Sequence, residues 1–244
     1  MTDTIKAKLA ALGHPEIKLF LSEWAPFAGS ESDINYSHKG AAWVAAFLTK
    51  AVAEKIAMGS YLIVDDGLVG QATFSDPSMA SLAHKDVAAD GSVHYYPTPP
   101  ANVFKMFANM TGTRRPATMS TTGSASNLGT FATSDANSVS IVVFNYNSTL
   151  VFQNTDGLLT ETPENFVVDV NNLPFNGEVT VRQYLVDAAT SNLKAFYSPP
   201  YPDPSLQMVV GSPFNAIVEN GRLILPSYPL KLGVTFYQIS RPSM

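Results

Sequence analysis

An acidic residue closes a short apolar run near the start of the chain. Residues 17–22 are rich in aliphatic and aromatic side chains and lie between Pro15 and Pro26, so they predict a buried strand. Glu23 stands at the C-terminal end of that strand and is followed by Trp24. Barrel enzymes carry their chemistry at the C-terminal ends of their strands. Glu23 is therefore a candidate catalytic carboxylate, with a solvated loop residue or a helix cap as the alternative interpretation.

The residues after Glu23 predict a strand–helix–strand unit that would position it. A polar loop over 25–36 leads to Ser37, a favourable N-cap for a helix over 38–58 that Gly59 would end. Residues 61–64 are apolar and predict a second buried strand, which ends in Asp65 and Asp66. Such a unit implies two parallel strands. We therefore expect Glu23 and Asp65 to open on the same side.

Two further helices frame this unit. Ile5, Leu9 and Leu12 recur at helical spacing and predict a short helix with Gly13 as its stop. Pro100 suits a first helical turn and opens a helix that Gly112 would end. Residues 67–98 show no strong period, so no element is predicted there.

Beyond Gly112 the pattern changes to short alternating runs separated by turn residues. This change places a boundary near residues 113–118 and predicts an antiparallel sandwich. Asn220-Gly221 is the clearest hairpin turn. The predicted strands are 128–133, 139–146, 166–170, 178–186, 214–218, 222–225 and 233–239.

The order of these motifs resembles glycoside hydrolase family 39 (GH39), the β-xylosidase and α-L-iduronidase family. The similar features are a strand, Glu-Trp, a polar loop with a histidine, an Ala-rich helix and a second strand ending in an acid. Residues 96–104 resemble the last barrel helix of that family, and 172–187 with Ser191-Asn192 resemble its β-sandwich. The resemblance implies an α+β fold: residues 1–112 as the C-terminal portion of a (β/α)8 glycosidase barrel (βαβα), and residues 118–244 as an antiparallel β-sandwich accessory domain.

The resemblance also implies roles for single residues. Glu23 matches the nucleophile at the tip of the seventh barrel strand, which attacks the anomeric carbon of a glycoside. Trp24, His38 and Asp65 are the expected substrate-binding residues, although a histidine at a helix start is also an ordinary capping or solvated residue. Carbohydrate is the expected ligand, and no cofactor is expected.

Three departures separate the chain from a complete enzyme of this family. A full barrel takes about 250 residues and eight strands, whereas residues 1–112 have room for two strands. The general acid of the family is the Glu of an Asn-Glu pair, and the chain has no Asn-Glu dipeptide. Leu62 stands where the family has a Trp that walls the sugar pocket. Asp65, Asp66, Glu31 and Asp33 are the nearest alternative acids, and none matches the family's acid.

Two hypotheses from different classes remain open. The chain is either a glycosidase piece that carries the nucleophile without the acid/base half, inactive by itself, or a non-catalytic remnant or carbohydrate-associated module. Two parallel strands cut from a barrel would expose unpaired edges and apolar faces. We therefore expect the chain either to self-associate through residues 1–112 or to require a barrel-completing chain.

Composition narrows the possible partners. The 244 residues are 45% apolar and 14% charged with a net charge of −5, which is typical of a folded protein without a basic face for nucleic acid or a membrane surface. There is no cysteine, and the four histidines show no helical pairing, so zinc is not indicated. Asp33 and Asn35 begin like a calcium loop, but His38 stands where that loop needs Gly. No signal peptide is recognised, which predicts a cytoplasmic protein for the chain as written.

Overall fold

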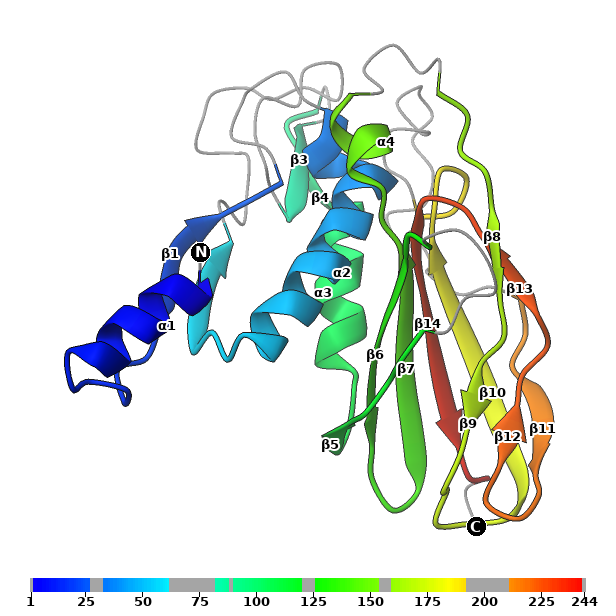
Figure 1. Ribbon diagram of the computed structural model, residues 1–244. Coiled ribbons are helices and arrows are strands. Elements are labelled where there is room, and N and C mark those ends of the chain that lie inside the picture. The colour runs from blue at the N-terminus through cyan, green and yellow to red at the C-terminus, as the bar shows by residue number, and fades with distance from the viewer. Residues whose placement is uncertain are drawn as a thin grey trace.

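A six-stranded antiparallel sheet forms the centre of the computed structural model, which describes residues 2–26, 33–61, 82–87, 90–119, 126–153, 159–191 and 211–242. Its strand order is β11-β10-β14-β7-β6-β5 (Figure 1). The strands are β5 (Thr113–Arg115), β6 (Leu128–Ser134), β7 (Ser138–Asn145), β10 (Gly177–Val186), β11 (Phe214–Val218) and β14 (Gly233–Ser240).

Both faces of this sheet are covered. Along β7, Ile141 and Val143 point into one apolar core, while Val142 and Phe144 point into another on the opposite face. This alternation explains the continuous apolar run 141–144, because a strand covered on both sides has no face that must be polar. The fold is therefore a layered α+β arrangement built on an antiparallel sheet.

Short strand pairs cover the first face. They are β8 (Glu164–Phe166) with β13 (Tyr228–Leu230), and β9 (Asp169–Val170) with β12 (Leu223–Ile224). Between β11 and β12, Asn220 and Gly221 have φ values of 51° and 72°, and Glu219 pairs with Arg222 across them. Two consecutive positive φ values are those of the predicted tight hairpin turn, which is confirmed.

Helices cover the second face. They are α2 (His38–Ala53) and α3 (Pro99–Ala108), which Figure 1 shows side by side against the sheet. Ala41 and Ala45 of α2 are fully buried against Val234 and Phe236 of β14. The small side chains let the helix approach the sheet closely. The apolar stripe of α2 is thus covered by the sheet of the second half of the chain.

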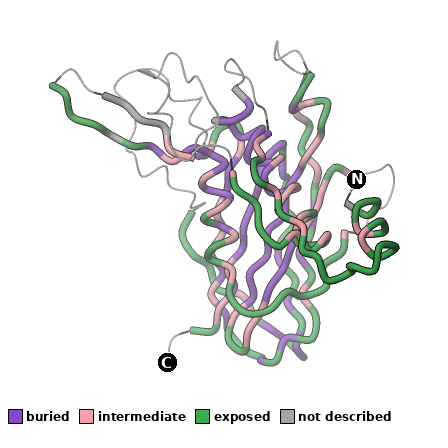
Figure 2. The backbone as a smooth tube through the Cα atoms, turned by 90° about the vertical axis from the view of Figure 1, so that its left-hand side faces the viewer, coloured by how far each residue is buried: buried purple, intermediate pink, exposed green. Residues whose placement is uncertain are grey.

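The N-terminal elements stand at the side of this body. Helix α1 (Thr2–Ala11) precedes β1 (Phe20–Trp24), which pairs in parallel with β2 (Met58–Tyr61) after the crossover helix α2. A strand–helix–strand unit is therefore present, although its second strand begins at Met58, three residues before the expected start at 61. Its membership of a barrel stays a prediction. Figure 2 shows α1 almost wholly exposed, in contrast to the buried helices and central strands.

Several element boundaries differ from those expected. Helix α2 ends at Ala53 rather than 58, because the chain turns at Lys55 with a φ of 52°, and Gly59 lies inside β2 instead of ending the helix. Helix α3 ends at Ala108 with Asn109 as its C-cap, four residues before the expected stop. The stretch 67–98 contains a hairpin of β3 (Ala83–Val87) and β4 (Val93–Pro97), so its expected lack of structure was wrong.

Three short elements complete the described chain. Residues Asp33–Tyr36 form a 3-10 turn before α2, and α4 (Ser148–Phe152) follows β7 with Asn147 as its N-cap. The third is β5, which pairs with β6 and joins α3 to the sheet. The division into residues 1–112 and 118–244 therefore stays a prediction, with α2, α3 and the sheet sharing one apolar core.

Candidate active site

The C-terminal end of β1 presents a carboxylate on its outer face. Glu23 is exposed, while Leu21 and Trp24 are half-buried toward α2. Phe20 pairs with Met58 and Leu21 with Gly59, so Glu23 lies near the C-terminal end of a parallel pair, as expected. We call the side of β1 and β2 that faces away from α2 the open face.

An extra residue in β1 separates the roles of Glu23 and Trp24. Leu21 pairs with Gly59 and Trp24 with Tyr61, so three steps along β1 match two along β2. Such a bulge lets both Leu21 and Trp24 point toward the helix although they are three positions apart, which in a regular strand would put them on opposite faces. Without it, Glu23 and Leu21 would share a face.

Trp24 belongs to an aromatic cluster on the helix side. Its indole stacks on Phe47 of α2 at 4.1 Å between ring centroids and meets the Tyr61 ring edge-on at 5.0 Å. Trp43 and Phe104 lie 6.0 Å and 5.7 Å away. Burial raises the pKa of the Tyr61 hydroxyl, which therefore stays protonated. These contacts favour a packing role for Trp24, and its expected contact with substrate stays a prediction.

Gly59 is needed for this cluster. A Cβ atom at position 59 would lie 2.7 Å from Trp24 Nε1, closer than real Cβ contacts. We expect Gly59→Ala to lower the free energy of unfolding by about 1–3 kcal/mol, because the stacked indole has no free space to move into. Thermal unfolding followed by tryptophan fluorescence measures this loss. The matched control is Ser60→Ala, on the open face of the same strand, and equal stability of the two variants would contradict the packing described.

His38 begins α2 and contacts Glu161. Ser37 caps α2 by accepting a hydrogen bond from Lys39 N at 3.3 Å, as predicted, which makes His38 the first residue of the helix. His38 is five residues before Trp43, or about 7 Å along the helix axis. Its Nε2 contacts Glu161 Oε1 at 2.8 Å, and both side chains are largely buried. His38 therefore links α2 to the segment before β8, and its role in substrate binding stays a prediction.

Of the remaining predicted acids, Asp33 begins the 3-10 turn Asp33–Tyr36. Asp65 and Asp66 fall in 62–81 and Glu31 in 27–32, outside the described residues. Within the described ranges no group of three or more His, Asp or Glu side chains could hold a metal ion. No helix in those ranges is long and apolar enough to cross a membrane.

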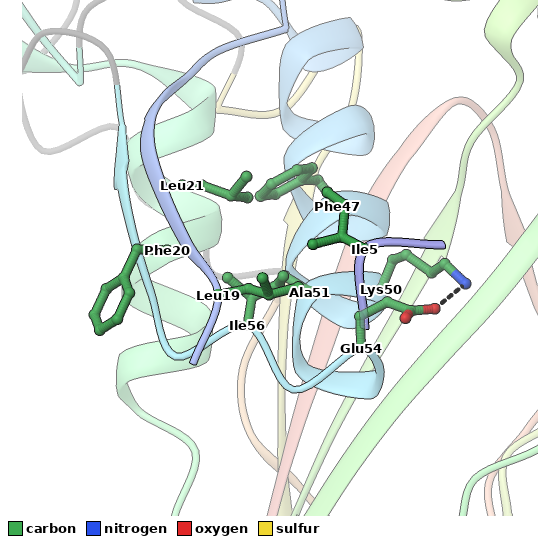
Figure 3. A pocket seen from close by; sticks show the side chains of 9 residues that line it. All are labelled: Ile5, Leu19, Phe20, Leu21, Phe47, Lys50, Ala51, Glu54 and Ile56. Carbon is green, nitrogen blue, oxygen red and sulfur yellow. Dashed lines mark ion pairs between the residues drawn. The ribbon is translucent and has the colours of Figure 1, made fainter. Parts of the chain in front are cut away.

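A groove adjoins the helix side of β1. It has a volume of about 240 Å³ and an apolar floor that includes Ile5, Leu21 and Phe47 (Figure 3). Lys50 Nζ and Glu54 Oε1 form an ion pair of 2.6 Å at its rim, and hydrogen bonding to Lys50 lowers the pKa of the Glu54 carboxyl. In Figure 3 the Phe20 ring points to the other side of β1 from Leu21. The groove and the open face are thus on opposite sides of the strand.

Solved structures of glycosidases share this fold. A GH39 enzyme from Xanthomonas axonopodis pv. citri superposes with a TM-score of 0.75 and 13% identity, over 98% of this chain and 48% of that one. A monomeric β-xylosidase from Caulobacter crescentus CB15 gives 0.73 and 16%, over 99% and 49%. The chain has the fold seen in GH39 enzymes. The resemblance expected from the sequence is confirmed at the level of the fold, and the chain spans about half the length of these structures.

Other comparisons add one relative and two negative results. A glucosidase from Croceicoccus marinus matches with a TM-score of 0.62 and 18% identity, over 99% of this chain and 50% of that one. No protein-family model matches the sequence, and no curated protein matches it.

Proposed function

We propose that this chain is the nucleophile-bearing part of a retaining glycoside hydrolase of the GH39 type. The observation that carries the proposal is the exposed Glu23 carboxylate at the C-terminal end of a parallel strand, in a chain with the fold of glycosidases. In a retaining mechanism such a carboxylate attacks the anomeric carbon and forms a covalent glycosyl intermediate. The ligand is then a carbohydrate, as in the β-xylosidase that shares the fold.

The acid/base half must come from elsewhere. Retaining enzymes hold a second carboxylate about 5 Å from the nucleophile, and the Asn-Glu pair that the family resemblance implies is absent. The open face exposes Phe20 by 59% and Met58 by 57%. Parallel strands are normally covered on both faces. These residues support a barrel-completing chain, or self-association through residues 1–112, as the covering partner.

A non-catalytic carbohydrate-associated module is the second candidate. The absence of the Asn-Glu pair favours it, because a nucleophile without an acid has little use on ordinary glycosides.

Covalent labelling of Glu23 separates the two candidates. The probe is a 2,4-dinitrophenyl 2-deoxy-2-fluoro-β-xyloside, whose leaving group departs without a proton. We expect a single fluoroxylosyl adduct on the peptide containing Glu23, detected by mass spectrometry and absent in Glu23→Gln. Glu178→Gln, which changes an exposed glutamate of β10, should label like the parent chain. A parent chain that forms no adduct would support the non-catalytic module instead.

A further inference from the structure

The extra residue in β1 brings a second side chain to the open face. Leu21 lines the groove beside Phe47, and Trp24 stacks on the same Phe47 ring, so both point toward α2. The two residues between them, Ser22 and Glu23, are both exposed. In a regular strand only one of two neighbours could face this way. The bulge therefore places the Ser22 hydroxyl on the same face as the Glu23 carboxylate.

The neighbouring strand adds a second hydroxyl. A Cβ at Gly59 would point at the Trp24 indole, and the Tyr61 ring meets that indole edge-on, so both positions face the helices. Ser60 lies between them on β2 and is exposed, which places it on the open face. Because Leu21 pairs with Gly59 and Trp24 with Tyr61, Ser22 and Glu23 of β1 both lie opposite Ser60 of β2. Adjacent strands lie about 4.8 Å apart, so Ser60 flanks the same carboxylate.

These three side chains are available to a ligand. Within the part of the chain that the structure describes, no hydrogen bond or ion pair involves the side chains of Ser22, Glu23 or Ser60. A hydroxyl both donates and accepts hydrogen bonds, and a carboxylate accepts them. Phe20 and Met58, paired in register on the same face, add exposed apolar surface next to this polar group.

The chemistry of this face selects a class of ligand. The Glu23 carboxylate disfavours an anion, and hydroxyls beside a carboxylate match the alternating donors and acceptors of a neutral polyol. Apolar surface next to them suits the C–H face of a sugar ring. Serine side chains are also small, so Ser22 and Ser60 leave the exposed carboxylate uncovered.

We propose that Ser22 and Ser60 are substrate-binding residues that hold the hydroxyl groups of the sugar unit attacked by Glu23. The inference rests on the proposed function and extends it to two residues that sequence patterns did not single out. Ser22 and Ser60 take the binding role that Trp24, packed against the helices, does not show.

D-Xylose binding tests the two hydroxyls. Titration of the full chain, followed by amide NMR shifts of residues 20–24 and 58–61, gives a dissociation constant for the parent and each variant. We expect Ser22→Ala and Ser60→Ala each to weaken binding about tenfold, the cost of one hydrogen bond of roughly 1.4 kcal/mol. Ser212→Ala, an exposed serine before β11, should bind like the parent. Because all three serines are exposed, unchanged thermal unfolding should confirm that the variants fold.

Disulfide formation tests the geometry separately. The chain has no cysteine, so a Ser22→Cys/Ser60→Cys pair should cross-link on mild oxidation, whereas Leu21→Cys/Ser60→Cys, on opposite faces, should not. The reverse result would overturn the shared face.

The outcomes distinguish this inference from the proposed function. If Glu23 is labelled by the fluoroxyloside but both serine variants bind xylose like the parent, the inference is wrong and the proposed function stands. If Glu23 is not labelled, the proposed function fails and the inference fails with it.

Discussion

The chain by itself is expected to hydrolyse an alkyl β-xyloside no faster than its Glu23→Gln variant does. An alkoxide leaves only with a proton, and help from a positioned general acid is commonly worth about 10² to 10⁴ in rate. The acid that the family resemblance implies is missing from the sequence. Product release measured at high protein concentration, with the Glu23→Gln variant as the baseline, checks this expectation.

Labelling by the dinitrophenyl fluoroxyloside shows which catalytic step is missing when the alkyl xyloside is not hydrolysed. Labelling of Glu23 by the dinitrophenyl fluoroxyloside together with no turnover of the alkyl xyloside would locate the defect in leaving-group protonation. Turnover of the alkyl xyloside that Glu23→Gln abolishes would show instead that an acid unrecognised in the sequence serves the site.

Replacing Phe236 by Ala is expected to cost about 3–5 kcal/mol of unfolding free energy. Phe236 lies on β14, is 1% exposed, and packs in the core between the sheet and α2. Domains of ordinary size have only about 5–15 kcal/mol in total, so this variant should be close to unfolding. Chemical denaturation followed by circular dichroism measures the loss.

Ile224→Ala is the matched control for this change. Ile224 also lies in a strand but is 53% exposed, so its truncation should cost little. The two variants together test whether the helices and the sheet share one core. A small effect for Phe236→Ala would mean that α2 does not depend on the sheet.

Local patterns predicted the unit around Glu23 well, because its signals lie within a few residues of each other. The Ser37 cap starts α2, and β1 begins inside the expected run 17–22. β2, at Met58–Tyr61, shares only Tyr61 with the expected strand 61–64, whose other residues lie outside the described part of the chain. The observed end of α2 differs from the predicted one because the residue type does not reveal the backbone conformation at that point. Lys55, rather than a glycine, adopts the positive φ after α2, and Gly59, which the sequence pattern predicts as the helix stop, lies in β2.

Features that join distant parts of the chain could not be predicted from local patterns. His38 contacts Glu161, 123 residues further on. Helix α2 packs against β14, and the sequence pattern of β14 does not indicate that a helix lies on it. The bulge beside Glu23 depends on the pairing register with β2, which sequence period does not fix. For this reason Ser22 and Ser60 became visible only in the structure.

The central position of β14 has a consequence for how the chain reaches this fold. β14 joins β7 to β10, so before it inserts, the other five strands form two separate groups, β5-β6-β7 and β10-β11. The helices α2 and α3 also lack part of the surface on which they pack until Val234 and Phe236 arrive. During synthesis, part of the apolar side of α2 must therefore remain uncovered while about 180 further residues, from Ala53 to Gly233, are added. A chaperone can bind this side in that period. Folding should be a late and highly non-local event, slow for a chain of this size.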